Sequence, residues 1–131
     1  MTLWLKSFRV LPVLDVDEST LLRMAVSLEA SSQHPIAQAL KDVAEKSRLS
    51  LFPVDHFQEV PHRGVGGRVH NRHVLFGSAA YLAECRLEFS EGLADAGSYE
   101  HRMGNTLAWM GWDGKVCAYF VFQRSGEKVN R

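Results

Sequence analysis

The hydrophobic pattern of this chain changes its period once, near Pro53, and this change decides the class of fold. Before Pro53, apolar residues recur at intervals of three and four, as they do along one face of a helix. The first such stripe follows Asp17, a favourable helix N-cap, and consists of Leu21, Met24, Ala25 and Leu28. The second begins at Pro35, a residue suited to a first helical turn, and consists of Ile36, Ala37, Leu40, Val43 and Ala44. We therefore predict two helices, the first ending near Ser31-Ser32.

After Pro53, short segments rich in β-favouring residues are separated by turn residues. Asn71-Arg72 and Asp113-Gly114 are the expected centres of two tight hairpins, and Ser78–Cys85 is a predicted short helix. Residues 86–103 are polar and compatible with a further helix. The predicted strands are Ser7–Leu14 (an edge strand or an extended lead-in), Val54–Val60, Arg68–His70, His73–Phe76, Thr106–Trp112 and Lys115–Phe122. These elements predict an α+β domain in which a twisted antiparallel sheet of about six strands is flanked by helices.

Composition excludes several classes of protein. The 131 residues suit one domain, and 15 basic against 15 acidic side chains leave no positive excess with which to neutralise nucleic-acid phosphates. Apolar runs are much shorter than the roughly 20 residues that cross a bilayer, and no secretory signal is visible, so we expect no membrane insertion of this chain. Cys85 and Cys117 lie far apart without a CxxC pattern, which predicts free thiols and a reducing, cytosolic compartment.

The connection between the two predicted helices carries the most unusual residues. Glu29 falls in the last turn of the first helix, where the helix dipole makes a carboxylate unfavourable by about 0.3–1 kcal/mol. His34 precedes Pro35, so its backbone must be extended at the start of the second helix, where Ser, Thr, Asp or Asn would cap better. Both residues make sense if they point at a ligand between the helix ends. Alternatively, Glu29 is a solvated surface charge and His34 a half-buried ring with its hydrogen bonds satisfied.

Two further segments are candidate parts of a site. His62-Arg63-Gly64-Val65-Gly66-Gly67 follows a predicted strand, and its glycines would let a ligand approach the main chain. No helix follows directly, so neither a dinucleotide-binding fingerprint nor a P-loop is present, and a β-bulge or strand turn is the alternative. Ser78 is most simply the N-cap of the short helix, and it could also offer its hydroxyl to a ligand.

The six histidines raise the possibility of a metal protein, which would bind zinc or copper stoichiometrically. They form neither HxxxH nor HExxH, and carboxylates do not accompany them at ligand spacing, so we expect no metal site. A serine hydrolase lacks support because the chain has no Gly-x-Ser-x-Gly elbow.

Taken in order, these segments resemble one family. Leu21–Pro35, with Glu29, Ser32, His34 and Pro35, resembles the Glu-x-x-Ser-x-His-Pro signature of heavy-metal-transporting (P1B-type) P-type ATPases, where it lies in the cytoplasmic nucleotide-binding domain (N-domain). The Gly64-x-Gly66 pair, Gly77 before a helix, and Gly104-x-Thr106 before the last hairpin follow in the same order and spacing. The resemblance covers residues 8–122, with residues 1–7 and 123–131 as flanking tails.

The resemblance implies an ATP-binding domain of a pump, in which copper is the expected ion. Glu29 and His34 would contact the adenine, Gly64 and Gly66 would line the pocket, and Ser78 would contribute a polar contact; Mg²⁺ would accompany the nucleotide. The domain would be monomeric, cytoplasmic and part of an integral membrane protein, with that pump's phosphorylation and actuator domains as partners. Because the phosphorylated aspartate of the family's Asp-Lys-Thr-Gly-Thr motif is missing, we expect an excised domain that binds ATP without turning it over.

The chain also departs from the family pattern. Ser78 stands where the family often has asparagine, and His62-Arg63 stand where a further glycine is common, which makes the expected pocket rim bulkier and more basic. Gln123 stands in place of a downstream aspartate. These departures leave one alternative function open, namely a degenerate or non-nucleotide interaction module on the same fold.

Overall fold

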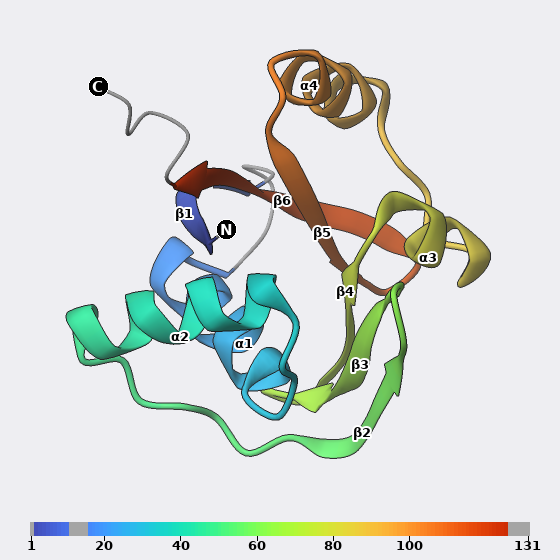
Figure 1. The fold of residues 1–131 in the computed structure, drawn as a ribbon. Helices are drawn as coiled ribbons and strands as arrows, with labels where there is room; N and C mark the ends of the chain where they lie inside the picture. Colours follow the sequence, from blue (N-terminus) through green and yellow to red (C-terminus); the bar gives the residue numbers. More distant parts are fainter. Residues whose placement is uncertain (1, 11–15, 126–131) are drawn as a thin grey trace.

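The computed structural model describes residues 2–10 and 16–125, which form one six-stranded antiparallel sheet and four helices (Figure 1). The strands lie in the order β1-β6-β5-β4-β3-β2, so β1 and β2 are the edges. Their bounds are β1 Thr2–Val10, β2 Asp55–Val60, β3 Gly64–Val69, β4 Arg72–Gly77, β5 Thr106–Trp112 and β6 Lys115–Ser125. The helices are α1 Glu18–Glu29, α2 Pro35–Ser47, α3 Ala79–Glu84 and α4 Glu91–Arg102. The predicted α+β class, strand number and antiparallel pairing are confirmed.

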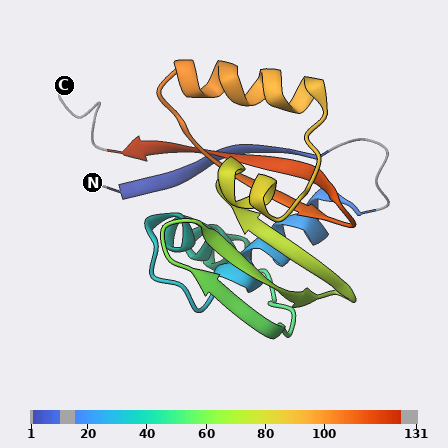
Figure 2. The ribbon, with the colours of Figure 1, turned by 90° about the vertical axis from the view of Figure 1, so that its right-hand side faces the viewer.

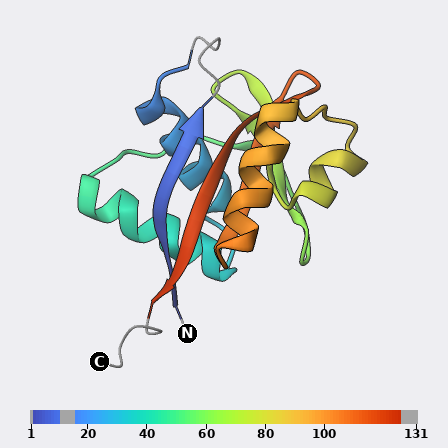
Figure 3. The ribbon, with the colours of Figure 1, turned by 90° about the horizontal axis from the view of Figure 1, so that it is seen from above.

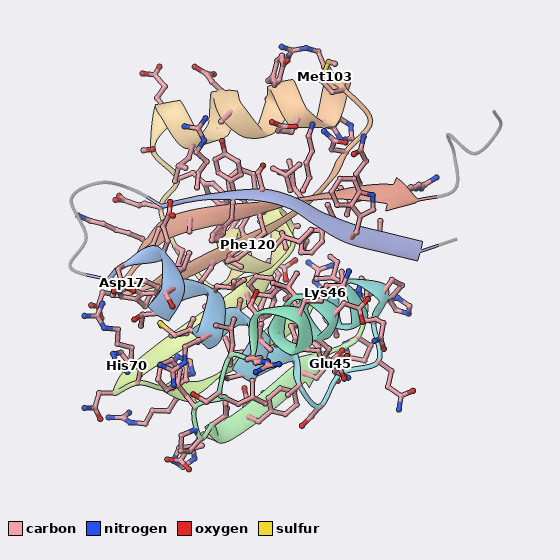
Figure 4. The ribbon with its side chains drawn as sticks, turned by 90° about the vertical axis from the view of Figure 1, so that its left-hand side faces the viewer. Asp17, Glu45, Lys46, His70, Met103 and Phe120 are labelled. Atoms are coloured by element: carbon pink, nitrogen blue, oxygen red, sulfur yellow. The ribbon has the colours of Figure 1, made fainter. Side chains whose placement is uncertain are left out.

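Helices cover both faces of the sheet. In Figure 2, α4 lies on one side of the sheet and α1 and α2 lie on the other; viewed from above, α4 runs alongside β6 (Figure 3). Side chains along a strand point alternately to the two faces. In β5, Ala108 and Met110 accordingly join the core beneath α1 and α2, and Trp109 joins the core beneath α3 and α4. Phe120, on β6, lies in the layer between the sheet and the α1–α2 pair (Figure 4).

The two helices form where the apolar spacing predicts them. Asp17 caps α1 by accepting a hydrogen bond at 2.8 Å from the Thr20 amide, at the helix start labelled in Figure 4. Leu21, Met24, Ala25 and Leu28 are all completely buried on its inner face. The second helix starts at Pro35 and ends at Ser47, and the left-handed backbone (φ 55°) of the C-cap residue Arg48 closes its last turn. Both predicted helices are confirmed.

One hairpin turn differs from the prediction by a residue. The β3–β4 loop is His70-Asn71, not Asn71-Arg72, because Val69 pairs with Arg72. Both loop residues are left-handed, with φ of 53° and 65°, as a two-residue turn matched to strand twist requires. The Asp113-Gly114 turn has the same geometry (φ 53° and 78°) and is confirmed.

The first strand lies earlier in the chain than expected. We predicted an edge strand or lead-in over Ser7–Leu14, whereas β1 runs from Thr2 to Val10; residues 11–14 of the predicted strand are outside the described residues. β1 is an edge strand, and its pairing with β6 extends to Thr2 opposite Ser125. Residues 2–7 and 123–125, which were expected to flank the domain, therefore lie in paired strands. Leu3, Leu5 and Phe8 explain this position, because they pack against the core under α1 and α2.

The segment 86–103 contains the helix that the sequence left open. Ser90 caps α4 by accepting from the Leu93 amide at 3.3 Å, and Leu93 is buried against the sheet. None of the helices within residues 2–10 and 16–125 has the length and apolar character that a bilayer crossing requires. Cys85 is exposed and Cys117 is buried, and both are free thiols, as predicted.

Two glycines of α4 give a matched test of how this helix packs. A Cβ on Gly97 would lie 2.5 Å and 2.6 Å from Cζ2 and Cη2 of the buried Trp109 indole, whereas a Cβ on Gly92 would meet nothing within 4 Å. We expect Gly97→Ala to destabilise the protein by about 1–3 kcal/mol through overpacking. Gly92→Ala should stabilise it by up to about 1 kcal/mol through helix propensity. Urea denaturation of both variants measures the difference, and equal effects would contradict the observed packing.

Candidate functional site

A gap in the sheet defines the candidate site. β5 pairs with β4 only through Trp109–Gly111, because β4 ends at Gly77 and the chain turns away into α3. Residues 106–108 therefore have no strand neighbour on the β4 side, while the connection between α1 and α2 approaches the same place from one face. The result is a pocket of about 220 Å³ that is lined by the ends of several elements.

Four of the five predicted site residues line this pocket: Glu29, His34, Gly64 and Ser78. The fifth, Gly66, is not among its lining residues. A Cβ on Gly66 would meet Cδ2 of Leu75 at 2.9 Å and Oη of Tyr81 at 3.4 Å, so this glycine packs against the neighbouring strand and α3. The structure thus brings together residues that are up to 49 positions apart in the sequence (29 to 78), and it leaves Gly66 beside the pocket.

Glu29 is the most unusual side chain of the pocket. It is only 5% exposed, and its Oε1 has no hydrogen-bond partner in the described part of the chain. The pKa of this carboxyl is raised to about 7 as the net result of four causes: burial, the largest, and the Glu59 charge raise it, whereas the Ser32 hydroxyl and the Lys41 charge lower it. The alternative of a solvated surface charge is wrong, because a carboxylate that lacks water and a partner is costly to ionise.

Ser32 holds the connection between the helices in place. It is buried, and its hydroxyl donates to Oε2 of Glu59 on β2 at 3.1 Å and accepts from the His34 amide at 3.2 Å. Lys41 of α2 donates to the Ser32 carbonyl at 3.0 Å. We did not identify Glu59 as a site residue from the sequence. Nothing in its own neighbourhood marks it, since its partner lies 27 positions earlier.

His34 itself caps α2. Its Nδ1 accepts a hydrogen bond from the Ile36 amide at 3.1 Å, and its backbone is extended (φ −62°, ψ 149°), as the following proline requires. Histidine therefore fills the capping role that we expected Ser, Thr, Asp or Asn to fill better. This bond has a chemical consequence: a neutral imidazole that accepts at Nδ1 carries its proton on Nε2. The exposed ring can therefore donate from Nε2 to a ligand.

The turn between β2 and β3 forms the opposite wall. His62 has a left-handed backbone (φ 67°), the region that favours glycine, which gives a physical reason why glycine suits this turn. Arg63 forms an ion pair with Glu84 of α3, and its carbonyl accepts from the Ser78 amide at 2.9 Å. Gly77 passes so close that a Cβ there would overlap the Arg63 carbonyl oxygen. The glycines of this region thus permit close backbone packing within the strands, and no P-loop is formed.

Ser78 has the structural role that the sequence suggested first. It caps α3 by accepting from the Tyr81 amide at 3.1 Å. Ser78 also lines the pocket, and its hydroxyl proton is not used by the cap, in which the oxygen only accepts.

A larger groove of about 1110 Å³ lies on the opposite face, between α3, α4 and β5, and shares Thr106 and Leu107 with the pocket. It contains none of the predicted site residues. The two buried side-chain atoms without a partner in residues 2–10 and 16–125 belong to Glu29 and Arg63, and both line the smaller pocket. Across these same residues, no group of three or more His, Cys, Asp and Glu could hold a metal ion. The smaller pocket is therefore the candidate site.

The raised pKa of Glu29 predicts a pH-dependent stability. Folding favours the protonated carboxyl, so this contribution is fully present below the ordinary pKa of 4.5 and is lost as the pH rises through about 7. Glu29→Gln removes the titration. The difference in unfolding free energy, variant minus wild type, should therefore increase by about 3 kcal/mol from about pH 4 to about pH 8. Urea denaturation at several pH values measures this gain, and parallel pH profiles for the two proteins would contradict it.

Comparison with known proteins connects this geometry to a family. No family model matches the chain. The Copper-exporting P-type ATPase B of Archaeoglobus fulgidus is 34% identical over 99 residues, which are 76% of this chain and 14% of that protein. The chain thus spans about a seventh of the length of this relative.

Solved structures share the fold. The crystal structure of the N-domain of HMA6, a copper-transporting P-type ATPase, has a TM-score of 0.74 at 19% identity, and the match covers 94% of this chain and all of that one. The catalytic domain of the CPx-ATPase CopB-B, studied for conformational changes upon nucleotide binding, has a TM-score of 0.62 at 22% identity over 93% of this chain and 37% of that one. On sequence and fold together, the chain belongs to the N-domains of the P1B-type family of P-type ATPases.

Proposed function

We propose that the pocket between the α1–α2 connection and the gap in the sheet binds the adenine ring of ATP. The observation that carries this proposal is the buried Glu29, which lines the pocket and whose Oε1 has no hydrogen-bond partner among the described residues. A carboxylate oxygen accepts hydrogen bonds only, and the exocyclic amine of adenine is a donor. The Nε2–H of His34 can donate to a ring nitrogen, or the imidazole can stack on the purine. The Ser78 hydroxyl and the main chain at Gly64 add polar and close-approach contacts.

The size of the pocket supports binding of the base rather than of the whole nucleotide. Its volume of about 220 Å³ is below the roughly 300–1,000 Å³ of pockets that enclose a complete drug-sized ligand. The ribose and phosphates would therefore extend out of the pocket, past the basic residues His62 and Arg63 at its wall. A phosphate chain held outside the domain, with Mg²⁺ bound to it, is accessible to a second protein domain.

This arrangement fits an ion pump in which one domain binds the nucleotide and another is phosphorylated. We propose that the chain presents Mg²⁺-ATP to an aspartate on a separate phosphorylation domain and also meets an actuator domain, itself being monomeric. Copper is the ion that we propose for the pump, because a relative of this chain is named as a copper exporter. Phosphoryl transfer depends mainly on positioning and charge stabilisation, so a domain that holds the base can contribute to catalysis without supplying the nucleophile.

The alternative is an interaction module that has kept the fold without binding a purine. The observation that favours it is the wall at His62-Arg63, where Arg63 is paired with Glu84 and is thereby partly neutralised. The two functions differ in one measurable property, the response of the pocket to ATP.

His34 gives the sharpest test, because its capping role can be separated from ligand binding. Asparagine is a good N-cap, so His34→Asn should retain the stability of α2, whereas His34→Ala should lose about 1 kcal/mol with the cap. Both variants lack the imidazole, and both should bind ATP about tenfold more weakly or worse, since base stacking or a hydrogen bond contributes about 1–3 kcal/mol. Titration of ATP into labelled protein, followed by NMR, measures the affinity.

In the wild type, ATP should shift the amide signals of residues 31–34 and of Ile36, Gly64 and Ser78. Equal affinity of the wild type and His34→Asn would remove His34 from the site. If ATP shifts no signal of the pocket in the wild type, the interaction-module alternative is favoured.

A further inference from the structure

We infer that the protonation state of Glu29 selects which purine the pocket holds, with the carboxylate taking a 6-aminopurine and the carboxylic acid taking a 6-oxopurine. This inference rests on the proposed function, because it assumes that a purine base occupies the pocket beside Glu29. It adds a chemical basis for base specificity and a reason for that specificity to change with pH.

Glu29 has one buried carboxyl oxygen without a partner in the described chain. The side chain is 95% removed from solvent, and Oε1 is buried with no partner in the described chain. Water therefore does not compete for this oxygen, and no neighbouring donor satisfies it. A ligand group placed against Oε1 must have the opposite hydrogen-bonding character, because an unmatched buried polar pair costs about 1–3 kcal/mol.

Purines differ in the substituent at C6, which a carboxyl group can bind through a hydrogen bond. Adenine carries an amine at C6, which donates, and hypoxanthine carries a carbonyl oxygen there, which accepts. An ionised carboxylate can only accept, so it pairs with the amine and repels the carbonyl. A protonated carboxyl can donate its proton to the carbonyl. Binding of the 6-aminopurine therefore releases the Glu29 proton to solvent, and binding of the 6-oxopurine takes one up.

The charged groups around Glu29 come from three places. Glu59 on β2 disfavours the carboxylate and Lys41 on α2 favours it, while the Ser32 hydroxyl between them also favours it. His34, His62 and Arg63 line the same pocket. Burial, the largest cause, and these neighbours together place the pKa of Glu29 at about 7, so both forms are populated near neutral pH. The selection can therefore reverse within the range from about pH 6 to pH 8.

The test compares ATP with inosine triphosphate (ITP), which carries hypoxanthine in place of adenine on the same ribose triphosphate. Isothermal titration calorimetry on the wild-type chain gives both affinities from pH 6 to pH 8. Affinity for ATP should rise by up to about tenfold over this range and that for ITP should fall by up to about tenfold. Titration of the phosphates is common to both ligands and cancels in the ratio of their affinities.

Proton linkage gives a second readout. Calorimetry at pH 7 in buffers of different ionisation enthalpy should show about half a proton released with ATP and about half a proton taken up with ITP. The two signs are opposite because one ligand requires the carboxylate and the other requires the acid.

Three variants separate this role from a structural one. Glu29→Gln carries an amide that both donates and accepts, so its ATP-to-ITP ratio should not change with pH. Glu59→Gln removes a charge that raises the pKa of Glu29, so the reversal should move to lower pH; Lys41→Met removes a charge that lowers it, so the reversal should move to higher pH. Shifts of opposite sign are not expected from a general loosening of the pocket.

The outcomes also distinguish the inference from the function on which it rests. If ATP binds and the ATP-to-ITP ratio of the wild type is independent of pH, the inference is overturned and the proposed function stands. If the ratio of Glu29→Gln follows the wild-type pH profile, Glu29 is not the selecting group. If neither nucleotide binds at any pH, the proposed function fails first.

Discussion

The hydroxyl of Ser32 is the contact on which the candidate site depends. The apolar stripes of α1 and α2 fix the two helices on one face of the sheet, but they do not fix the residues that join them. Ser32 does so by binding Glu59 on β2 and the His34 amide at the start of α2. The end of one helix, the start of the next and an edge strand are thereby held beside the gap that β4 leaves in the sheet.

One residue of the site, Glu29, lowers the stability of the fold. Glu29 directly follows Leu28, which is completely buried, and an apolar side chain at position 29 would avoid the cost of a carboxyl group without a partner. Glu29 is retained at the end of a helix, where the helix dipole is also unfavourable to it. Departures from the rules of stable packing are expected at functional sites, and this residue departs from two of them. His34 differs, because its ring serves the fold through Nδ1 and leaves Nε2 for a ligand.

Local sequence patterns predicted the elements that depend on neighbours along the chain. The helices α1 and α2, the cap at Ser78 and the Asp113-Gly114 turn follow from spacing, capping residues and turn residues within a few positions. The predicted positions were wrong where pairing with a segment distant in the sequence determines the structure. The first strand occupies Thr2–Val10 because it pairs with β6, more than 100 positions later, and the β3–β4 turn is placed by the register of Val69 opposite Arg72.

For the candidate site too, some features could be predicted from local sequence and others depend on distant contacts. The sequence by itself determined that Glu29, His34, Gly64 and Ser78 are unusual or special residues at the ends of elements, because dipoles, proline and capping act over a few residues. Only the tertiary structure decided that these four line one pocket and that Gly66 does not. It also decided that Glu29 is buried with one oxygen unpartnered and that the Glu59 charge acts on it. Burial and hydrogen-bond partners depend on which distant segments pack together, and the spacing of residues along a chain does not contain that information.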